Sequence, residues 1–164
     1  MGPDIDRIAA RLAVGELISA YTFAMDNRDL DWAADLFTED GRFRSADGVL
    51  NAQGREAICA QYRERFAALQ FSLHVTQDQV ITFTSDDAAT GLVSSHAELV
   101  RNGTPMIAAM RYHDVYRRCD DAKWRFADRN VRFFYYVPVE QYREALINGG
   151  RMRAYGDIRE ADLP

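Results

Sequence analysis

The chain has 164 residues, which suits one domain, because domains commonly hold roughly 100–200 residues. Its formal net charge of −5 provides no broad basic surface and argues against nucleic acid as a partner. Cys59 and Cys119 lie far apart and form no CxxC pair, which argues against a disulfide scaffold or a zinc ribbon. No apolar run approaches the roughly 18–20 residues that span a bilayer, and the first residues do not resemble a signal peptide. We therefore expect a cytoplasmic single domain over residues 1–164 without a membrane partner.

The first half of the chain has helical periodicity. Apolar residues recur at steps of three and four over residues 5–25, and Asn27 is typical of a helix end. Asp29 is placed to cap a short second helix. Residues 38–41 predict a turn, residues 42–45 a short strand, and residues 53–69 a third helix.

The second half has the composition of a sheet. Residues 71–136 are rich in β-branched and aromatic residues, and polar pairs at 86–87, 102–103 and 120–121 mark three hairpins. The pattern predicts four long consecutive antiparallel strands, followed by a short helix over residues 139–147. We expect the polar tail, residues 151–164, to be loosely held, although it could also close a pocket. Helices followed by a meander predict an α+β fold, in which the curved sheet encloses a cavity lined by alternate strand residues.

Two residues stand out as candidates for acid–base chemistry. Asp26 comes at the end of the first helix, where a carboxylate faces the negative end of the helix dipole unless a donor compensates it. His74 shares one face of the first long strand with Ser72 and Thr76, and Phe71 has the opposite parity. An imidazole held by a carboxylate is a suitable general base at neutral pH. The plain alternatives are a solvated aspartate and a half-exposed strand histidine.

Three further residues have open alternatives. His96 lies on the next strand, where antiparallel pairing could bring it close to His74 in one pocket. These residues lack the close spacing of metal ligands, so we expect no metal site. The Tyr21 hydroxyl could point into the cavity or be satisfied in the core. Arg129 and Arg132 have opposite parity, so at most one of them can face the cavity unless a bulge intervenes.

Several segments resemble the SnoaL-like family of the nuclear transport factor 2-like superfamily. The matching segments cover its first helices, the start of its third helix and its last hairpin: YTFAMDNRDLD at 21–31, LFTEDG at 36–41, GREAI at 54–58, YHDVY at 112–116, and WRF at 124–126 with Arg129. The resemblance implies a cystatin-like cone, with N-terminal helices packed in the concave face of a strongly curved antiparallel sheet. It also implies a homodimer or homotrimer formed through the exposed side of the sheet.

The resemblance also suggests a reaction. Scytalone dehydratase, hexachlorocyclohexane dehydrochlorinase and bile acid 7α-dehydratase share an Asp–His pair, which Asp26 and His74 match in position. It implies a cofactor-independent lyase of the dehydratase type, in which His74 abstracts a proton and Asp26 orients the imidazole. Tyr21 and His96 would then donate hydrogen bonds, and Arg129 would anchor the substrate.

The expected substrate is a hydrophobic cyclic small molecule. The residues expected to line its pocket are Val14, Leu17, Ile18, Phe66, Phe71 and Met110. Two alternatives within the same fold are an enzyme of the ketosteroid isomerase or polyketide cyclase type and a non-catalytic subunit. The second alternative, exemplified by the small subunit of a ring-hydroxylating dioxygenase, predicts a filled cavity.

Overall fold

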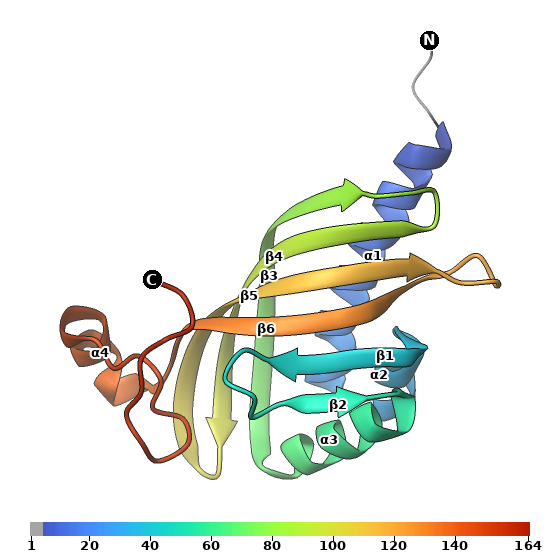
Figure 1. The fold of residues 1–164 in the computed structure, drawn as a ribbon. Helices are drawn as coiled ribbons and strands as arrows, with labels where there is room; N and C mark the ends of the chain where they lie inside the picture. The colour runs from blue at the N-terminus through green and yellow to red at the C-terminus, as the bar shows by residue number, and fades with distance from the viewer. Residues whose placement is uncertain (1–4) are drawn as a thin grey trace.

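The inner face of one bent six-stranded sheet packs against helices in the computed structural model, which describes residues 5–164 (Figure 1). The helices are α1 (Ile5–Asn27), α2 (Leu30–Asp35), α3 (Arg55–Ala67) and α4 (Tyr142–Asn148), with the 3-10 turn η1 (Val139–Gln141) before α4. The strands are β1 (Phe37–Ser45), β2 (Asn51–Gln53), β3 (Leu69–Phe83), β4 (Ala88–Arg101), β5 (Thr104–Arg118) and β6 (Trp124–Pro138), in the sheet order β2-β1-β6-β5-β4-β3. The predicted α+β cone and its four long strands are confirmed.

The sheet differs from the prediction at β1. β1 pairs in parallel with β6, so the sheet is mixed rather than antiparallel throughout. The turn predicted at residues 38–41 is wrong, because β1 continues through this segment with a shift of register between Phe37 and Arg42. Gly41 lies at this irregularity, where a Cβ atom would come within 2.9 Å of the Thr38 carbonyl oxygen. The turn-forming residues therefore produce a bulge instead of a chain reversal.

The helix predictions for residues 5–35 are confirmed. The Asp29 carboxylate accepts a hydrogen bond from the Trp32 backbone N–H at 2.9 Å and so caps α2. By length and mean hydropathy α1 could cross a membrane, contrary to the expectation from apolar runs alone. This is weak evidence for a membrane span, because a core helix passes the same test, and the apolar stripe of α1 from Val14 to Met25 is buried inside the fold.

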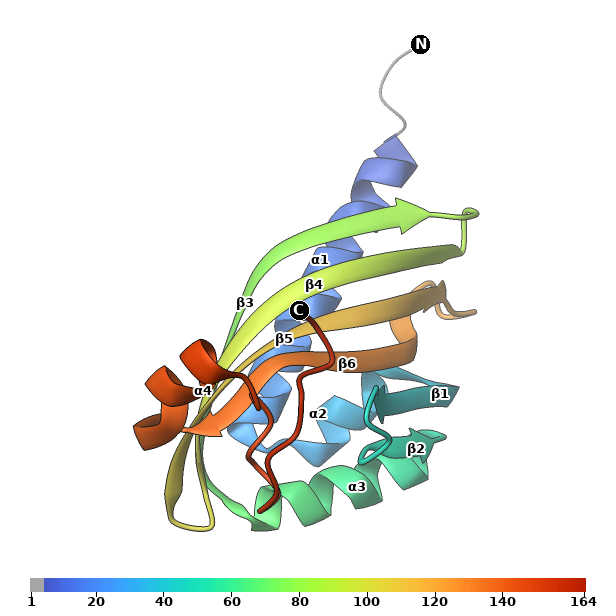
Figure 2. The same cartoon turned by 60° about the vertical axis from the view of Figure 1, so that its left-hand side comes forward.

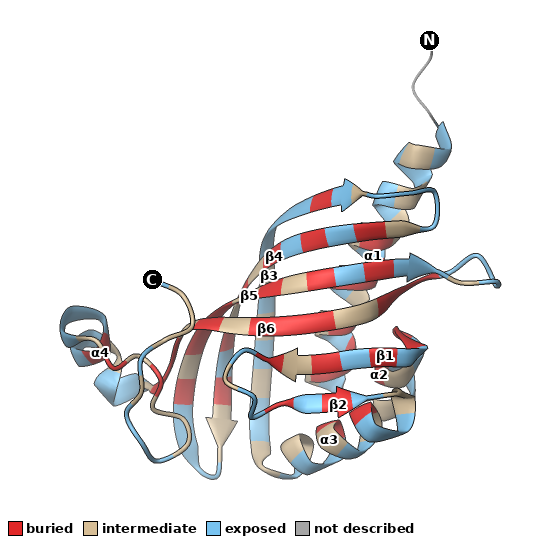
Figure 3. Ribbon diagram, in the orientation of Figure 1, coloured by how far each residue is buried: buried red, intermediate tan, exposed pale blue. Residues whose placement is uncertain are grey.

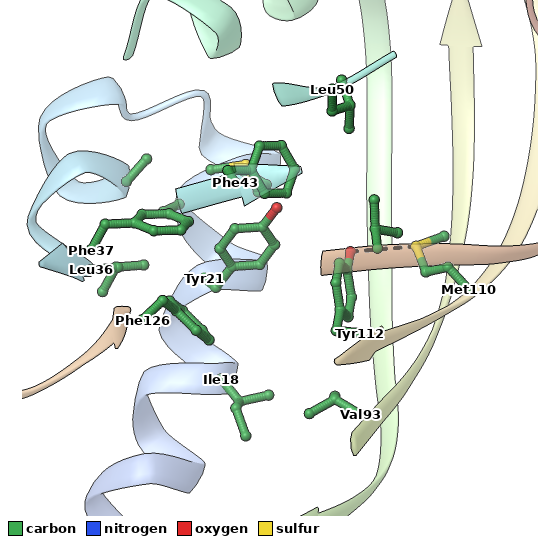
Figure 4. Packing of buried hydrophobic residues seen from close by; sticks show 14 of the residues in the cluster. Ile18, Tyr21, Leu36, Phe37, Phe43, Leu50, Val93, Met110, Tyr112 and Phe126 are labelled. Atoms are coloured by element: carbon green, nitrogen blue, oxygen red, sulfur yellow. Dashed lines mark hydrogen bonds between the residues drawn. The ribbon is translucent and has the colours of Figure 1, made fainter. Parts of the chain in front are cut away.

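An aromatic cluster fills the centre of the cone. Buried and exposed positions alternate along β4 and β5, so one face of the sheet contributes to the core (Figure 3). Tyr21 projects from α1 into this core, where its ring packs edge-on against Phe37, Tyr112 and Phe126 at centroid distances of 5.7–6.5 Å (Figure 4). Such edge-to-face contacts favour one arrangement of rings over others. The core therefore fixes the position of the Tyr21 hydroxyl.

The tail is not loosely held. Beyond Val131 strand β6 has no partner in β1, and the tail lies along this free edge (Figure 2). The Leu163 backbone N–H donates to the Phe133 carbonyl at 3.1 Å, and Met152 forms a parallel bridge with Tyr136. Met152 is buried. The polar sequence of the tail does not indicate that it packs against β6, because this contact depends mainly on backbone hydrogen bonds.

Position 91 on β4 has no room for a side chain, because Tyr116 on the neighbouring strand β5 packs against it. A Cβ atom on Gly91 would lie 2.6 Å from the Tyr116 hydroxyl oxygen, and Tyr116 is fully buried. We predict that Gly91→Ala lowers the free energy of unfolding by about 1–3 kcal/mol, because overpacking forces the ring to move. Urea unfolding measures this loss.

The matched control is Gly15→Ala on α1, whose added Cβ meets only the end of the Gln79 side chain at 3.4 Å. This variant should gain about 0.5–1 kcal/mol, since Ala is the better helix residue. Equal stability of the two variants would contradict the steric argument.

Candidate active site

Asp26 and His74 form a hydrogen-bonded pair at the cavity. Asp26 Oδ1 lies 2.6 Å from His74 Nδ1, and Asp26 Oδ2 accepts a hydrogen bond from the His74 backbone N–H at 2.8 Å. Both side chains are less than one-fifth exposed. Because the carboxylate holds Nδ1–H, the lone pair of Nε2 is left available. The pair therefore has the geometry of an oriented general base.

The local fold explains why these two residues meet. Asp26 belongs to the last turn of α1, which contains no basic residue to compensate the helix dipole. The two donors of His74 take that role. One turn earlier, the hydroxyl groups of Thr22 and Thr76 are hydrogen-bonded at 2.9 Å, which aligns α1 with β3. Ser72, His74 and Thr76 thus share the inner face of β3, as alternation predicts.

His74 lines a cavity of about 270 Å³ between the sheet, α1 and α3. Most of its wall is apolar, and its exposed lining residues, Val49 and Glu64, mark where it opens to solvent. Ser72 Oγ and Gln61 Nε2 also belong to lining residues, and both are buried without a hydrogen-bond partner within residues 5–164. Unpartnered buried polar atoms favour binding of a ligand or water. The further lining residues used below are Tyr21, Tyr62, Arg65, Phe66, Ala97, Leu99, Arg101, Met110, Tyr136 and Tyr155.

Tyr21 lines the same cavity as His74. The Tyr62 hydroxyl donates a hydrogen bond to the Tyr21 oxygen at 3.0 Å, which leaves the Tyr21 proton free for another acceptor. Burial raises the pKa of Tyr21 above its ordinary value, although the Arg129 guanidinium opposes this shift. Burial also raises the pKa of Tyr62 well above the ordinary value. Both phenols therefore remain protonated and can act as donors at neutral pH.

Arg129 does not line the cavity, contrary to its expected role as a substrate anchor. Its side chain is fully buried in the core, where Nη2 lies 3.2 Å from Asp114 Oδ2. The guanidinium carbon is 3.9–4.2 Å from the ring centroids of Tyr21, Tyr112 and Phe126. The charge is therefore balanced by a carboxylate and three aromatic faces. Arg129 supports the ring of Tyr21 from behind the cavity wall.

His96 and Phe71 also lie outside the cavity. His96 pairs in register with Val75, so it occupies the outer face of the sheet, where its Nδ1 is 2.9 Å from Gln77 Oε1. Phe71 is about half exposed and does not line the cavity. Adjacency of strands brings His96 close to His74 along the sheet but on the opposite side. These two predictions of a shared pocket are wrong.

The remaining predicted lining residues divide into two groups. Phe66 and Met110 line the cavity as expected. Val14, Leu17 and Ile18 are buried in the core but do not line it. Their helical stripe correctly indicated burial, which is common to core and cavity positions. Within residues 5–164 no three His, Cys, Asp or Glu side chains group as metal ligands.

Sequence analysis missed the cavity residues Tyr62, Arg65, Arg101 and Tyr155. Tyr62 lies on the buried side of α3, where helical spacing alone does not distinguish a core position from a cavity position. Arg65 follows Arg63 and Glu64 in a charged run that is typical of a solvated helix face. Tyr155 comes from the tail, which no local pattern connects with the cavity. Only tertiary contacts identify Arg65 and Tyr155 as cavity residues.

Comparison with known proteins gives a family match over residues 6–130, described as a SnoaL-like domain. The chain belongs to the SnoaL-like family. Gamma-hexachlorocyclohexane dehydrochlorinase of Sphingobium indicum is 26% identical over 139 residues, which are 83% of this chain and 88% of the relative.

Solved structures show the same fold. Hexachlorocyclohexane dehydrochlorinase LinA-type3 of Novosphingobium barchaimii superposes with a TM-score of 0.76 at 24% identity, covering 83% of this chain and 94% of the relative. A putative scytalone dehydratase of Novosphingobium aromaticivorans superposes with a TM-score of 0.75 at 20% identity, covering 81% and 89%. The family membership and the lyase-type relatives agree with the resemblance seen in the sequence.

The buried Asp114 gives a testable pH dependence. Burial raises its pKa to about 6, although Arg129 and the Tyr116 hydroxyl, which donates to it at 2.9 Å, both oppose the shift. The unfolded carboxyl titrates near 3.9, so the stability contributed by protonated Asp114 is complete below about pH 4 and is lost as the pH rises through about 6. We predict that Tyr116→Phe raises this pKa further, because an opposing hydrogen bond is removed.

Titration of the Asp114 carboxyl carbon by NMR measures the pKa of Asp114 in the wild-type protein and in Tyr116→Phe. Tyr142→Phe on α4, far from Asp114 in the fold, is the control and should leave the midpoint unchanged. A midpoint that falls or does not move in Tyr116→Phe would contradict the assignment.

Proposed function

We propose that this protein is a cofactor-independent lyase that removes a proton from a hydrophobic cyclic substrate and eliminates a β leaving group. Dehydration is the reaction that we favour. The observation that carries the proposal is the Asp26–His74 pair, whose Nδ1 contact of 2.6 Å orients an imidazole at a mostly apolar cavity. The lyase names of its relatives support the same reaction class.

His74, Asp26 and Tyr21 each have a separate role in the proposed elimination. His74 Nε2 takes a proton from a carbon next to a carbonyl group, and the electron pair of the broken C–H bond forms the enolate. Asp26 holds the productive tautomer and stabilises the resulting imidazolium. Tyr21 donates its free proton in a hydrogen bond to the enolate oxygen. The C–O bond then breaks as the C=C bond forms, and the imidazolium proton passes to the leaving hydroxyl, which departs as water.

Two observations favour this proposal over its alternatives. An isomerase or cyclase of the ketosteroid type uses a carboxylate as the base, whereas both oxygens of Asp26 are engaged by His74. A purely structural subunit predicts a filled cavity, whereas this cavity has a volume of about 270 Å³ and contains unpartnered polar atoms. Both features suit an enzyme whose base is histidine.

We predict that His74→Ala lowers elimination by about 10²–10⁴-fold, the range typical of a lost general base. Asp26→Asn should lower it similarly, because the amide cannot hold the productive tautomer. The assay offers cyclic β-hydroxy ketones and γ-hexachlorocyclohexane, and measures loss of water by mass spectrometry and release of chloride.

The matched control is His96→Ala, which removes an imidazole from the outer face of the same sheet and should retain full activity. Circular dichroism verifies that each variant is folded. Unchanged turnover in folded His74→Ala would refute the proposed base.

We further propose that the protein forms a homo-oligomer through the outer face of the sheet. Apolar side chains lie exposed there on β3, β4 and β5: Leu73, Val75, Leu92 and Val115. Ile107 and Ala109 lie on the same outer face, but they pack with Tyr135, Val137 and Ala145, so the C-terminal part of the chain covers them. An exposed apolar patch of this kind is usually an interface.

We predict that Leu92→Glu converts the oligomer to monomer in light scattering, because it places a charge in the interface. Ile158→Glu, a similarly exposed apolar position in the tail, should leave the mass unchanged. A wild-type protein that is monomeric at high micromolar concentration would refute the interface.

A further inference from the structure

Two arginine side chains in the cavity wall have no carboxylate partner among the residues that the structure describes. Arg65 projects from α3 and Arg101 ends β4, and neither forms an ion pair with a carboxylate of residues 5–164. Glu64 also lines the cavity but is exposed and pairs with neither of them. This end of the cavity therefore carries excess positive charge.

The surroundings hold these two cations in place. Arg101 Nη1 donates to the Ala154 carbonyl oxygen at 3.0 Å, and its guanidinium carbon lies 4.8 Å from the ring centroid of Tyr155. Arg65 and Arg101 both act electrostatically on the phenol of Tyr136. The two arginines are thus grouped around the Tyr136 phenol. Neutral partners orient the guanidinium groups without neutralising them.

Such a pair is incomplete without an anion. A guanidinium taken partly out of water loses hydration and requires a partner of opposite charge. Two cations at one site also repel each other unless an anion lies close to both. The planar N–H fork of arginine fits a carboxylate, which it binds through two parallel hydrogen bonds. A carboxylate is therefore the ligand group that suits this end of the cavity.

The distance between the two arginines and the Asp26–His74 pair leaves room for a ring of the substrate. His74 pairs in register with Ala97, and Arg101 comes four residues later on the same face of β4. At about 3.3 Å per residue these two positions on β4 are about 13 Å apart, and the long arginine side chain spans part of that distance. The wall between them is apolar and includes Leu99.

We propose that Arg65 and Arg101 bind a substrate carboxylate, so that the substrate is a cyclic acid whose charge lies one or two rings away from the carbon that loses its proton. The assignment of the reacting end rests on the function proposed above. The anion site itself rests only on the arginines and their surroundings. Arg65 is then a specificity-determining residue, which selects acids over neutral molecules of the same shape.

The test compares two ligands of the same shape, the anionic 2-naphthoate and the neutral 2-naphthamide, by isothermal titration calorimetry. We expect the wild-type protein to bind naphthoate at least tenfold more tightly. Arg65→Met should abolish this preference and change naphthamide affinity by less than twofold. The matched control is Arg63→Met, which removes an exposed arginine from the same helix and should leave both affinities unchanged.

Several results would overturn the proposal. These are equal affinities in the wild-type protein, no naphthoate binding at millimolar concentration, or a preference that persists in a folded Arg65→Met/Arg101→Met double variant. His74→Ala separates this proposal from the enzymatic one, because it should keep the naphthoate preference while losing elimination. In the wild-type protein, a naphthoate preference without any elimination activity would support the anion site and refute the lyase.

Discussion

The Asp26 carboxylate binds His74 through both of its oxygens, and the organisation of the site depends on this contact. One oxygen binds the backbone of β3 and the other binds the ring, so both the strand and the imidazole are positioned relative to α1. The same two hydrogen bonds compensate a negative charge at the unfavourable end of a helix. A single interaction thus closes the helix onto the sheet and selects the tautomer of the base. Removing it would affect both the position and the chemistry of His74.

The core arginine Arg129 and the two cavity arginines occupy different electrostatic environments. Arg129 lies in the core with Asp114 and three aromatic faces, so its charge is balanced internally. Arg65 and Arg101 lie in the cavity wall among tyrosines, without a carboxylate. The first arrangement stabilises the ring that carries the Tyr21 hydroxyl. The second leaves positive charge for a molecule that comes from outside.

The sequence predicted the helices and strands better than it predicted which face of the sheet each residue occupies. The helical stripe of α1 and the three hairpin breaks identified most of the fold, because periodicity and turn residues act locally. Asp26 was noticeable because it violates a local rule, and such violations are informative. His96 was misplaced because the face of a residue depends on the register with the next strand, which β3 sets by pairing Val75 with His96.

Arg65 and Tyr155 show a second limit of sequence reasoning. A charged residue on a helix is usually solvated, and no pattern within α3 reveals that Arg65 faces a cavity closed by a distant tail. Phe71 and His74 have opposite parity, so they could not both face the cavity, and only the curvature of the finished sheet decides between them. These errors concern long-range geometry and not residue chemistry.

The docked tail has an implication for how such a protein can change. Its residues 154 and 155 orient one arginine of the cavity, although they lie after the segment that matches the family. The proposed catalytic pair, Asp26 and His74, is built entirely from α1 and β3, which come much earlier in the chain. Alterations in the last fourteen residues would therefore change the proposed anion site while the Asp26–His74 pair stays intact. The proposed recognition site and the proposed reactive pair are thus separable parts of one small cone.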